Sequence, residues 1–150
     1  SDLKIAFEKI KQNLNTYFSK TSHSAEIQIQ KQIDNGIEVI LGVKRDPTFG
    51  PVLLFGAGGK YAELFADSNL TLFPLSLKKV KKIVETSKIY ELLSGFRDDP
   101  PYKLDRLYQI MLNLGGLIDA YPEIKEIEIN PLLITHENIW ALDPKVILNN

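Results

Sequence analysis

Three side chains near the C-terminus carry oxygen atoms that could bind a metal ion. The stretch EIEINPLLI (126–134) alternates like a β-strand, yet Glu128 and Asn130 stand where isoleucine or valine would pack better. A turn at HEN (136–138) predicts a hairpin that sets Asn130 opposite, or within one residue of, Asp143. Carboxylates and carboxamides are the hard oxygen ligands that Mg²⁺ prefers, with waters and phosphates completing its coordination.

The same pattern has a second interpretation, in which none of these side chains binds a metal. Glu128 and Asn130 would then face solvent from an edge strand, and Asp143 would begin a turn before Pro144. In the metal-binding interpretation, Pro131, which lacks a backbone donor, favours a bulge at this point that could aim the ligand side chains. The residue pattern alone leaves both interpretations open.

Other motifs have simpler explanations. FGAGGKY (55–61) resembles a phosphate-binding loop, but Leu54 and Tyr61 stand where a P-loop has glycine and Ser or Thr, so we predict a glycine-rich turn. The lysines of KKVKK (78–82) are expected on the solvated face of a helix. His23 and His136 lie in polar turns without an i, i+4 partner and are interpreted as surface residues.

Composition limits the possible classes of protein. The 150 residues are 44% hydrophobic and 25% charged, which is enough for one domain with its own core. A net charge of -1 provides no global field for nucleic acid or a membrane surface, and no apolar run reaches the ~20 residues of a membrane helix. The absence of cysteine fits a reducing compartment, so we expect a soluble, cytoplasmic protein. Because the chain starts without methionine in a helical pattern, we expect it to be a piece of a longer protein.

Hydrophobic periodicity and turn residues predict strands and helices that occur in blocks. Such a mixture indicates an α/β (α+β) domain, a mainly antiparallel sheet covered by helices. We expect helices near 3–20, 77–85, 87–94 and 104–118, and strands near 25–33, 37–46, 52–56, 60–67, 126–135 and 139–148.

The order of the segments resembles a known family. GIEVILGVKRDPTFGPVLLFGAGGKYAELFADSNLTLFPL, then LLSGFRDDPP, then EIEINPLLI and LDPK are similar to the C-terminal half of the ATP-grasp domain in nucleoside-diphosphate-forming acyl-CoA synthetases. The similarity runs from about Ala25 to Leu148; it is strongest to the ADP-forming acetyl-CoA synthetase β subunit and weaker to the succinyl-CoA synthetase β subunit. It implies that residues 1–150 form one domain, the C-terminal half of an ATP-grasp fold.

This resemblance also implies ligands and site residues. Asn130 and Asp143 match the two Mg²⁺ ligands of the family, and Glu128 would assist directly or through water. The hinge that pairs with adenine corresponds to the segment 30–34. Glu38 would take the ribose hydroxyls of ATP or ADP, and Arg45 would lie near the phosphates. The hinge residues expected to bind the cofactor are Gln30, Lys31 and Gln32.

The implied parent enzyme is an acid–CoA ligase that forms ADP through a phosphoryl intermediate. Its CoA and acid sites would lie in domains outside this sequence, on an α subunit or on the same chain, so the 150 residues alone would be inactive or nearly so. The alternative is a non-catalytic regulatory or assembly module with the ATP-grasp fold, as in a synthetase-like domain fused to a protein acyltransferase. An RNA-binding sheet finds no support in net charge or aromatic placement.

Overall fold

The protein is described from a computed structural model that covers residues 2–18 and 26–149. The chain divides into two compact units, Ser1–Asp34 and Asn35–Asn150, which we describe one at a time. Among the described residues, no helix has the length and apolar character needed to cross a bilayer.

The first unit consists of one helix and an extended segment. Helix α1 (Asp2–Phe18) confirms the expected amphipathic helix, while its expected end near Lys20 lies outside the described residues. Residues 26–34 run without regular secondary structure, so the strand expected in AEIQIQKQI is not formed over this part of the chain. Alternating Ile and Gln provide two faces, but a strand also needs a neighbouring backbone to pair with.

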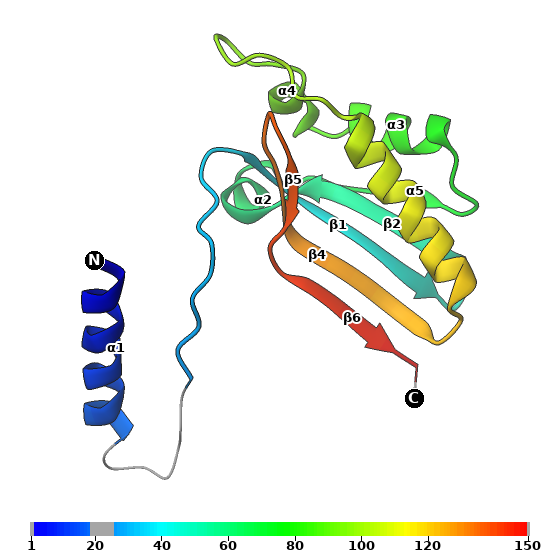
Figure 1. The fold of residues 1–150 in the computed structure, drawn as a ribbon. Helices are drawn as coiled ribbons and strands as arrows, with labels where there is room; N and C mark the ends of the chain where they lie inside the picture. Colours follow the sequence, from blue (N-terminus) through cyan, green and yellow to red (C-terminus); the bar gives the residue numbers. More distant parts are fainter. Residues whose placement is uncertain (1, 19–25, 150) are drawn as a thin grey trace. The chain divides into compact units, whose positions relative to one another are not determined.

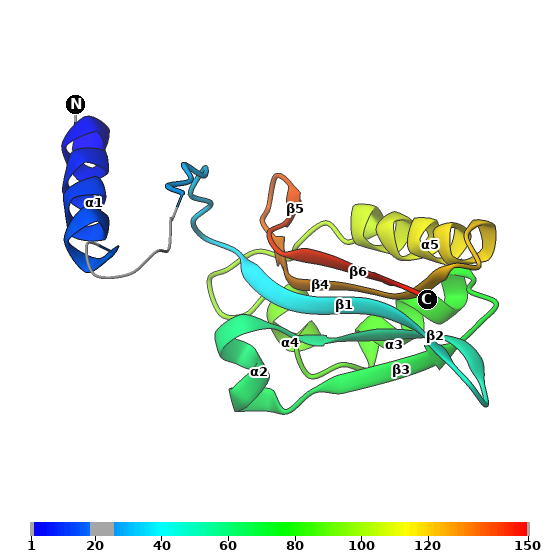
Figure 2. The same cartoon turned by 90° about the horizontal axis from the view of Figure 1, so that it is seen from below.

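The second unit is built on a six-stranded antiparallel sheet (Figures 1 and 2). The sheet order is β3-β2-β1-β4, and two short strands, β5 and β6, pair with successive parts of β4. This topology confirms the predicted antiparallel sheet. The strands are β1 (Ile37–Asp46), β2 (Gly50–Ala57), β3 (Ser68–Leu72), β4 (Ile124–Ile134), β5 (Ile139–Ala141) and β6 (Pro144–Leu148).

Helices cover one face of this sheet and enclose the core. Helices α3 (Leu77–Glu85) and α5 (Asp105–Ala120) contact each other, with α3 against β2 and β3 and α5 against β1 (Figure 1). The short helices α2 (Gly59–Phe65) and α4 (Tyr90–Leu93) complete the connections. As expected, Ser76 caps α3, because its Oγ accepts a hydrogen bond from Lys79 N at 3.3 Å. The side chains that fill the centre include Val39, Leu41, Phe55, Val80, Leu107 and Met111.

The segment KYAELFAD was expected as a strand and is instead helix α2. Tyr61 and Phe65 are one helical turn apart, and their rings stack at 6.2 Å against the core. The missed strand is the next segment, SNLTL, which forms β3 along the edge of the sheet. Its alternation of Leu70 and Leu72 with polar residues was the sequence signal for it.

A bulge in β4 divides the strand into two parts. Val39 pairs with Leu132 and Leu41 with Ile129, so β4 contains one residue more than β1 across this interval. The extra residue changes which positions face the core: Ile127 and Ile129 before the bulge, but Leu132 and Ile134 after it. The bulge expected at Pro131 is therefore confirmed, and the Asn130–Pro131 peptide bond within it is cis.

Candidate functional site

The closing hairpin brings Asn130 and Asp143 together. β4 pairs with β5 and then with β6 in one continuous register, in which Leu132 lies opposite Ala141 and Ile129 opposite Pro144. Between these pairs, Asn130 N donates a hydrogen bond to Asp143 O at 3.3 Å. The predicted pairing of these two residues is confirmed.

Glu128 belongs to the same group of side chains. Its Oε1 lies 3.5 Å from Asn130 Nδ2, at the limit of a hydrogen bond. Because Ile127 and Ile129 point into the core, Glu128 and Asn130 point to the opposite face of the sheet, which we call the open face. Glu128 is half-buried, whereas Asn130 and Asp143 are exposed. The hairpin therefore carries two carboxylates and one carboxamide at neighbouring backbone positions.

This donor set fits a hard divalent cation that keeps part of its coordination free. Within residues 2–18 and 26–149, no three His, Cys, Asp or Glu side chains are grouped so that they could hold a metal by themselves. The hairpin supplies only two carboxylates, and its third oxygen comes from the amide of Asn130. Mg²⁺ is commonly bound in this way, through one or two carboxylates with waters and substrate phosphates.

Glu38 lies on the same open face, at the start of β1. Its neighbours Ile37 and Val39 are core residues, so its side chain projects from the face opposite α3 and α5. Glu38 pairs with Leu133, three residues along β4 from Asn130 and on the other side of the bulge. A single extended ligand could reach both residues.

The glycine-rich segment after β2 is a strand-to-helix turn packed against β1. Gly58 N donates to Glu38 O at 3.0 Å, and a Cβ on Gly58 would lie 2.6 Å from the carbonyl carbon of Val39. A Cβ on Gly56 would likewise overlap the carbonyl oxygen of Asp67. The predicted turn is thus a place where backbones approach closely, and its glycines make that approach possible.

The open face contains a hollow of about 630 Å³, a size typical of ligand sites. Apolar side chains of β1, β2 and β3 line most of it, while Glu126 and Glu128 line its border on β4. This hollow was not predicted from the sequence, although apolar residues on both faces of these strands were a signal for it. The apolar side chains include Ile40, Val52, Leu54, Leu70 and Leu72.

Arg45, expected near the phosphates, is not brought to this site. It lies near the end of β1 remote from Glu38, and its guanidinium donates to backbone carbonyls where α5 ends. Nε lies 2.9 Å from Ile124 O and Nη2 3.3 Å from Tyr121 O, with a further bond to Ile118 O. The carbonyls of Ile118 and Tyr121 lie at the C-terminal end of α5 and carry its partial negative charge, while that of Ile124 belongs to the start of β4; together they hold the cation on the helix side of the sheet. In this structure the guanidinium of Arg45 therefore lies on the helix side of the sheet, and its expected place near the phosphates stays a prediction.

The hinge residues lie in the other unit. Gln30, Lys31 and Gln32 are exposed in the extended segment, and Gln32 Nε2 donates to Asp34 Oδ1 at 2.8 Å. The geometry of the second unit neither includes them nor tests their predicted contact with adenine.

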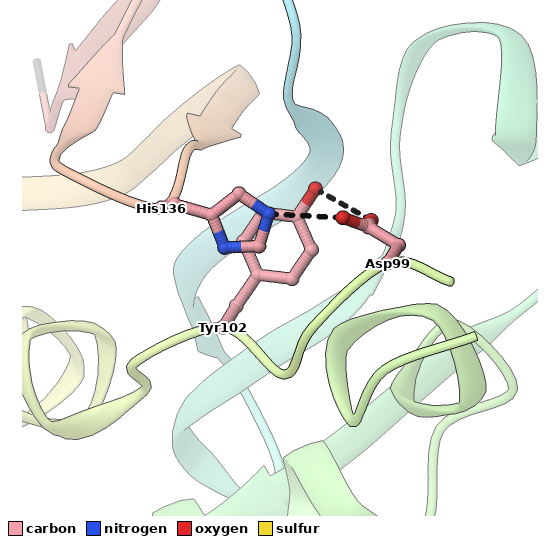
Figure 3. Close-up of polar contacts among 3 residues, drawn as sticks. All are labelled: Asp99, Tyr102 and His136. Carbon is pink, nitrogen blue, oxygen red and sulfur yellow. Dashed lines mark hydrogen bonds and ion pairs between the residues drawn. The ribbon is translucent and has the colours of Figure 1, made fainter. Parts of the chain in front are cut away.

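His136 takes part in a cluster that the sequence did not reveal. Its Nε2 lies 3.0 Å from Asp99 Oδ1, and its ring stacks on Tyr102 with centroids 4.0 Å apart (Figure 3). Tyr102 donates its hydroxyl hydrogen to Asp99 Oδ2 at 3.2 Å. Burial, followed by the charge of Asp99, raises the pKa of Tyr102. This cluster, named the Asp99 cluster below, connects the α4–α5 loop to the β4–β5 turn.

Comparison with proteins of known sequence gives consistent matches. Residues 1–148 match the ATP-grasp domain family. The chain is 34% identical over 143 residues to subunit β of the ADP-forming acetate–CoA ligase I of Pyrococcus furiosus, covering 95% of this chain and 61% of that protein. It is 31% identical over 148 residues to ADP-forming acetate–CoA ligase I of Archaeoglobus fulgidus, covering 99% of this chain but 22% of that one. The chain thus spans less than two thirds of these relatives.

Solved structures agree with the sequence matches. One is the dinucleotide forming acetyl-coenzyme A synthetase 1 of Ca. Korarchaeum cryptofilum, in complex with coenzyme A, acetyl-coenzyme A and a phosphorylated phosphohistidine segment. It superposes with a TM-score of 0.79 at 31% identity, covering 97% of this chain and 65% of that one. The same enzyme with coenzyme A and Mg-AMPPCP gives a TM-score of 0.73 at 33% identity, over 78% of this chain and 55% of that one. With its antiparallel sheet and near-complete sequence match, the chain belongs to the ATP-grasp family.

Proposed function

We propose that this chain is the C-terminal half of an ATP-grasp domain and binds Mg-ATP or Mg-ADP on the open face of its sheet. Asn130 and Asp143, assisted by Glu128, would hold the magnesium. The observation that carries the proposal is the juxtaposition of Asn130 and Asp143 across the hairpin, with Glu128 beside them. The solved relative that contains Mg-AMPPCP supports this ligand class.

Each residue has a distinct task in this site. Asn130 offers a neutral oxygen, and its amide group lies beside Glu128, so that the two side chains orient each other. Asp143 adds a second negative charge, which favours a divalent cation over a monovalent one. Magnesium, when bound, neutralises phosphate charge and orients the phosphoryl group for transfer.

The nucleoside would lie toward the start of β1. Glu38 projects from the open face and pairs with Leu133, three residues along β4 from Asn130. Its carboxylate can accept hydrogen bonds from the ribose hydroxyls. The backbone of Gln30, Lys31 and Gln32 would pair with adenine. Arg45 is left out, because its donors already bind carbonyls at the end of α5.

We further propose that the parent protein is an ADP-forming acid–CoA ligase. Its relatives include subunits and longer chains of such ligases, and the matched region is only part of each. CoA and acid would bind to other domains or to an α subunit, and the location would be cytoplasmic. A regulatory module that has lost turnover is the alternative, and magnesium-dependent nucleotide binding distinguishes the two.

Titration calorimetry of ADP into the full-length protein, with and without Mg²⁺, tests the site. We expect binding that needs Mg²⁺ and that both Asn130→Ala and Asp143→Ala abolish. Asn113→Ala and Asp119→Ala remove the same chemical groups from exposed positions on α5 and should bind like wild type. Absence of binding to the wild type, or binding unchanged by the hairpin substitutions, would favour the regulatory module.

A further inference from the structure

We infer that Gly59 is a positioning residue for Glu38: its missing side chain leaves the space that the Glu38 carboxylate occupies. The functional part of this inference rests on the proposed nucleotide site, in which Glu38 accepts hydrogen bonds from ribose. The structural part concerns only two residues of the second unit and can be tested without any ligand.

The contact is specific to the side chain of Glu38. A Cβ added to Gly59 would overlap Glu38 Oε2, and it would lie 2.5 Å from Cδ and 3.2 Å from Cβ of the same residue. The neighbouring Gly58 differs, because a Cβ there would collide with the backbone of Val39 and Ile40. Gly58 therefore allows two backbones to approach, whereas Gly59 gives room to one carboxylate.

The surrounding structure fixes the rest of Glu38. Its backbone pairs with Leu133 in the sheet, and its carbonyl accepts a hydrogen bond from Gly58 N at 3.0 Å. The side-chain torsions determine where the carboxylate lies, and the absence of a Cβ on Gly59 keeps the observed position open to it. A carboxylate that is already oriented can accept ligand hydroxyls without the entropic cost of ordering a flexible glutamate.

The competing explanation is that Gly59 serves its own backbone alone. Its φ is +50°, in the left-handed region that glycine tolerates best, so any side chain there introduces strain whether or not Glu38 is present. A loss of stability in Gly59→Ala alone does not distinguish the two explanations. A double-mutant cycle with Glu38→Ala does, because it isolates the coupling between the two positions.

The first experiment measures denaturant midpoints for wild type, Gly59→Ala, Glu38→Ala and the double variant in the full-length protein. We expect Gly59→Ala to lower the midpoint more in the wild type than in the Glu38→Ala background, where the backbone strain remains but the carboxylate no longer competes for the space. Equal losses in both backgrounds would overturn the inference and leave only backbone strain.

Gly50 provides a matched control for the strain. Its φ is +72° and nothing lies within 4 Å of an added Cβ, so Gly50→Ala introduces a left-handed alanine without a steric partner. Its effect should be the same with and without Glu38→Ala. If Gly50→Ala were coupled to Glu38→Ala as strongly as Gly59→Ala is, the cycle would report a general change in stability and not the contact. That result would also overturn the inference.

The second experiment measures whether the orientation of Glu38 serves ribose recognition. We compare Mg-ADP with Mg-2′-deoxy-ADP by calorimetry and expect the wild type to prefer ADP by about tenfold or more, the value of one hydrogen bond to a charged group. Gly59→Ala and Glu38→Gln should both reduce this preference, while binding stays dependent on Mg²⁺. A preference that Gly59→Ala leaves unchanged would contradict the positioning role. No binding of either nucleotide to the wild type would instead overturn the proposed function, and the stability cycle would still decide the contact.

Discussion

At the scale of single residues, strand parity decides which side chains enter the site. Glu38 and Glu128 project from the open face, because their sequence neighbours fill the core on the other side, and Asn130 follows the core residue Ile129. Arg45 belongs to the same sequence block as Asp46, but its guanidinium lies where α5 ends. The residue type does not show which partner Arg45 binds, because a guanidinium can donate hydrogen bonds to phosphate and to helix carbonyls equally well.

Arg45→Met tests this assignment at the same scale. The substitution removes the hydrogen bonds to Ile118, Tyr121 and Ile124, and we expect it to lower the free energy of unfolding by about 1–3 kcal/mol, with Mg-ADP affinity unchanged. The control is Lys44→Met, because Lys44 is exposed and its ion pair with Glu126 at 3.6 Å should contribute less than about 1 kcal/mol. Denaturant unfolding and calorimetry give the two quantities. If Arg45→Met lost affinity for Mg-ADP while its stability stayed unchanged, Arg45 would instead be assigned to the phosphates.

At the scale of elements, the β1–β2 hairpin is closed by one carboxylate. Asp46 Oδ1 accepts hydrogen bonds from Phe49 N at 2.9 Å and Thr48 N at 2.8 Å, which stabilise the turn. These backbone bonds, with a smaller contribution from the charge of Lys44, hold the pKa of Asp46 below its usual value of 3.8. The lowered pKa means that the charged form is favoured in the folded state.

The pH dependence of Asp46→Ala follows from this shift. The stabilisation is present above the unfolded-state pKa and is lost as the pH falls through the lower folded-state pKa. We therefore expect the variant to be less stable than wild type at neutral pH and the difference to shrink on acidification. Denaturant midpoints measured from neutral pH to about pH 2 give this difference. A difference that does not change with pH would show that the charge of Asp46 is unimportant.

The Asp99 cluster (Figure 3) makes a different prediction at the element scale. Because Asp99 and His136 are exposed, we expect Asp99→Ala to change the free energy of unfolding by no more than about 1 kcal/mol. Hydrogen exchange should nevertheless become faster in residues 95–104 and 135–138, which the cluster connects. The neighbouring exposed Asp98 is the control, and Asp98→Ala should leave these rates unchanged. Equal rates in all three proteins would show that the cluster does not restrain the loop.

At the scale of elements, some features of the fold and the site could be predicted from the sequence, and others could not. The hairpin register that pairs Asn130 with Asp143 follows from a short turn, so local pattern was sufficient. The position of Arg45 depends on carbonyls more than 70 residues away in the chain, which no local pattern encodes. Helix α2 was mistaken for a strand because its few residues, rich in aromatic side chains, fit either period, and tertiary contacts decide such cases.

At the scale of the whole second unit, the two faces of the sheet have different roles. The face under α3 and α5 holds the continuous core, whereas the open face holds the hollow and the polar residues of the proposed site. Exposed Leu70 and Leu72 on edge strand β3 extend the apolar lining of the hollow. Stability and ligand binding are therefore separable, and substitutions on the helix side report the first without disturbing the second.

Tyr108 lies on the helix side of the sheet, and alkaline unfolding of its variants measures stability separately from ligand binding. Burial, and then the charges of Glu85, Tyr90 and Asp105, raise the pKa of Tyr108 to about 12, so the folded state keeps the hydroxyl protonated. Its contribution is complete below the unfolded-state pKa of about 10 and is lost as the pH rises through about 12. Unfolding midpoints should thus fall steeply over this interval, and Tyr108→Phe should reduce the slope.

The control for this slope is Tyr121→Phe, since Tyr121 is exposed. It should leave the slope unchanged, because this side chain is not enclosed by the hydrophobic core. Nucleotide binding by Tyr108→Phe at neutral pH should match wild type, since the ring lies on the helix side of the sheet. If Tyr108→Phe retained the full slope, other groups would cause the alkaline unfolding, and the burial of this one phenol would not govern it.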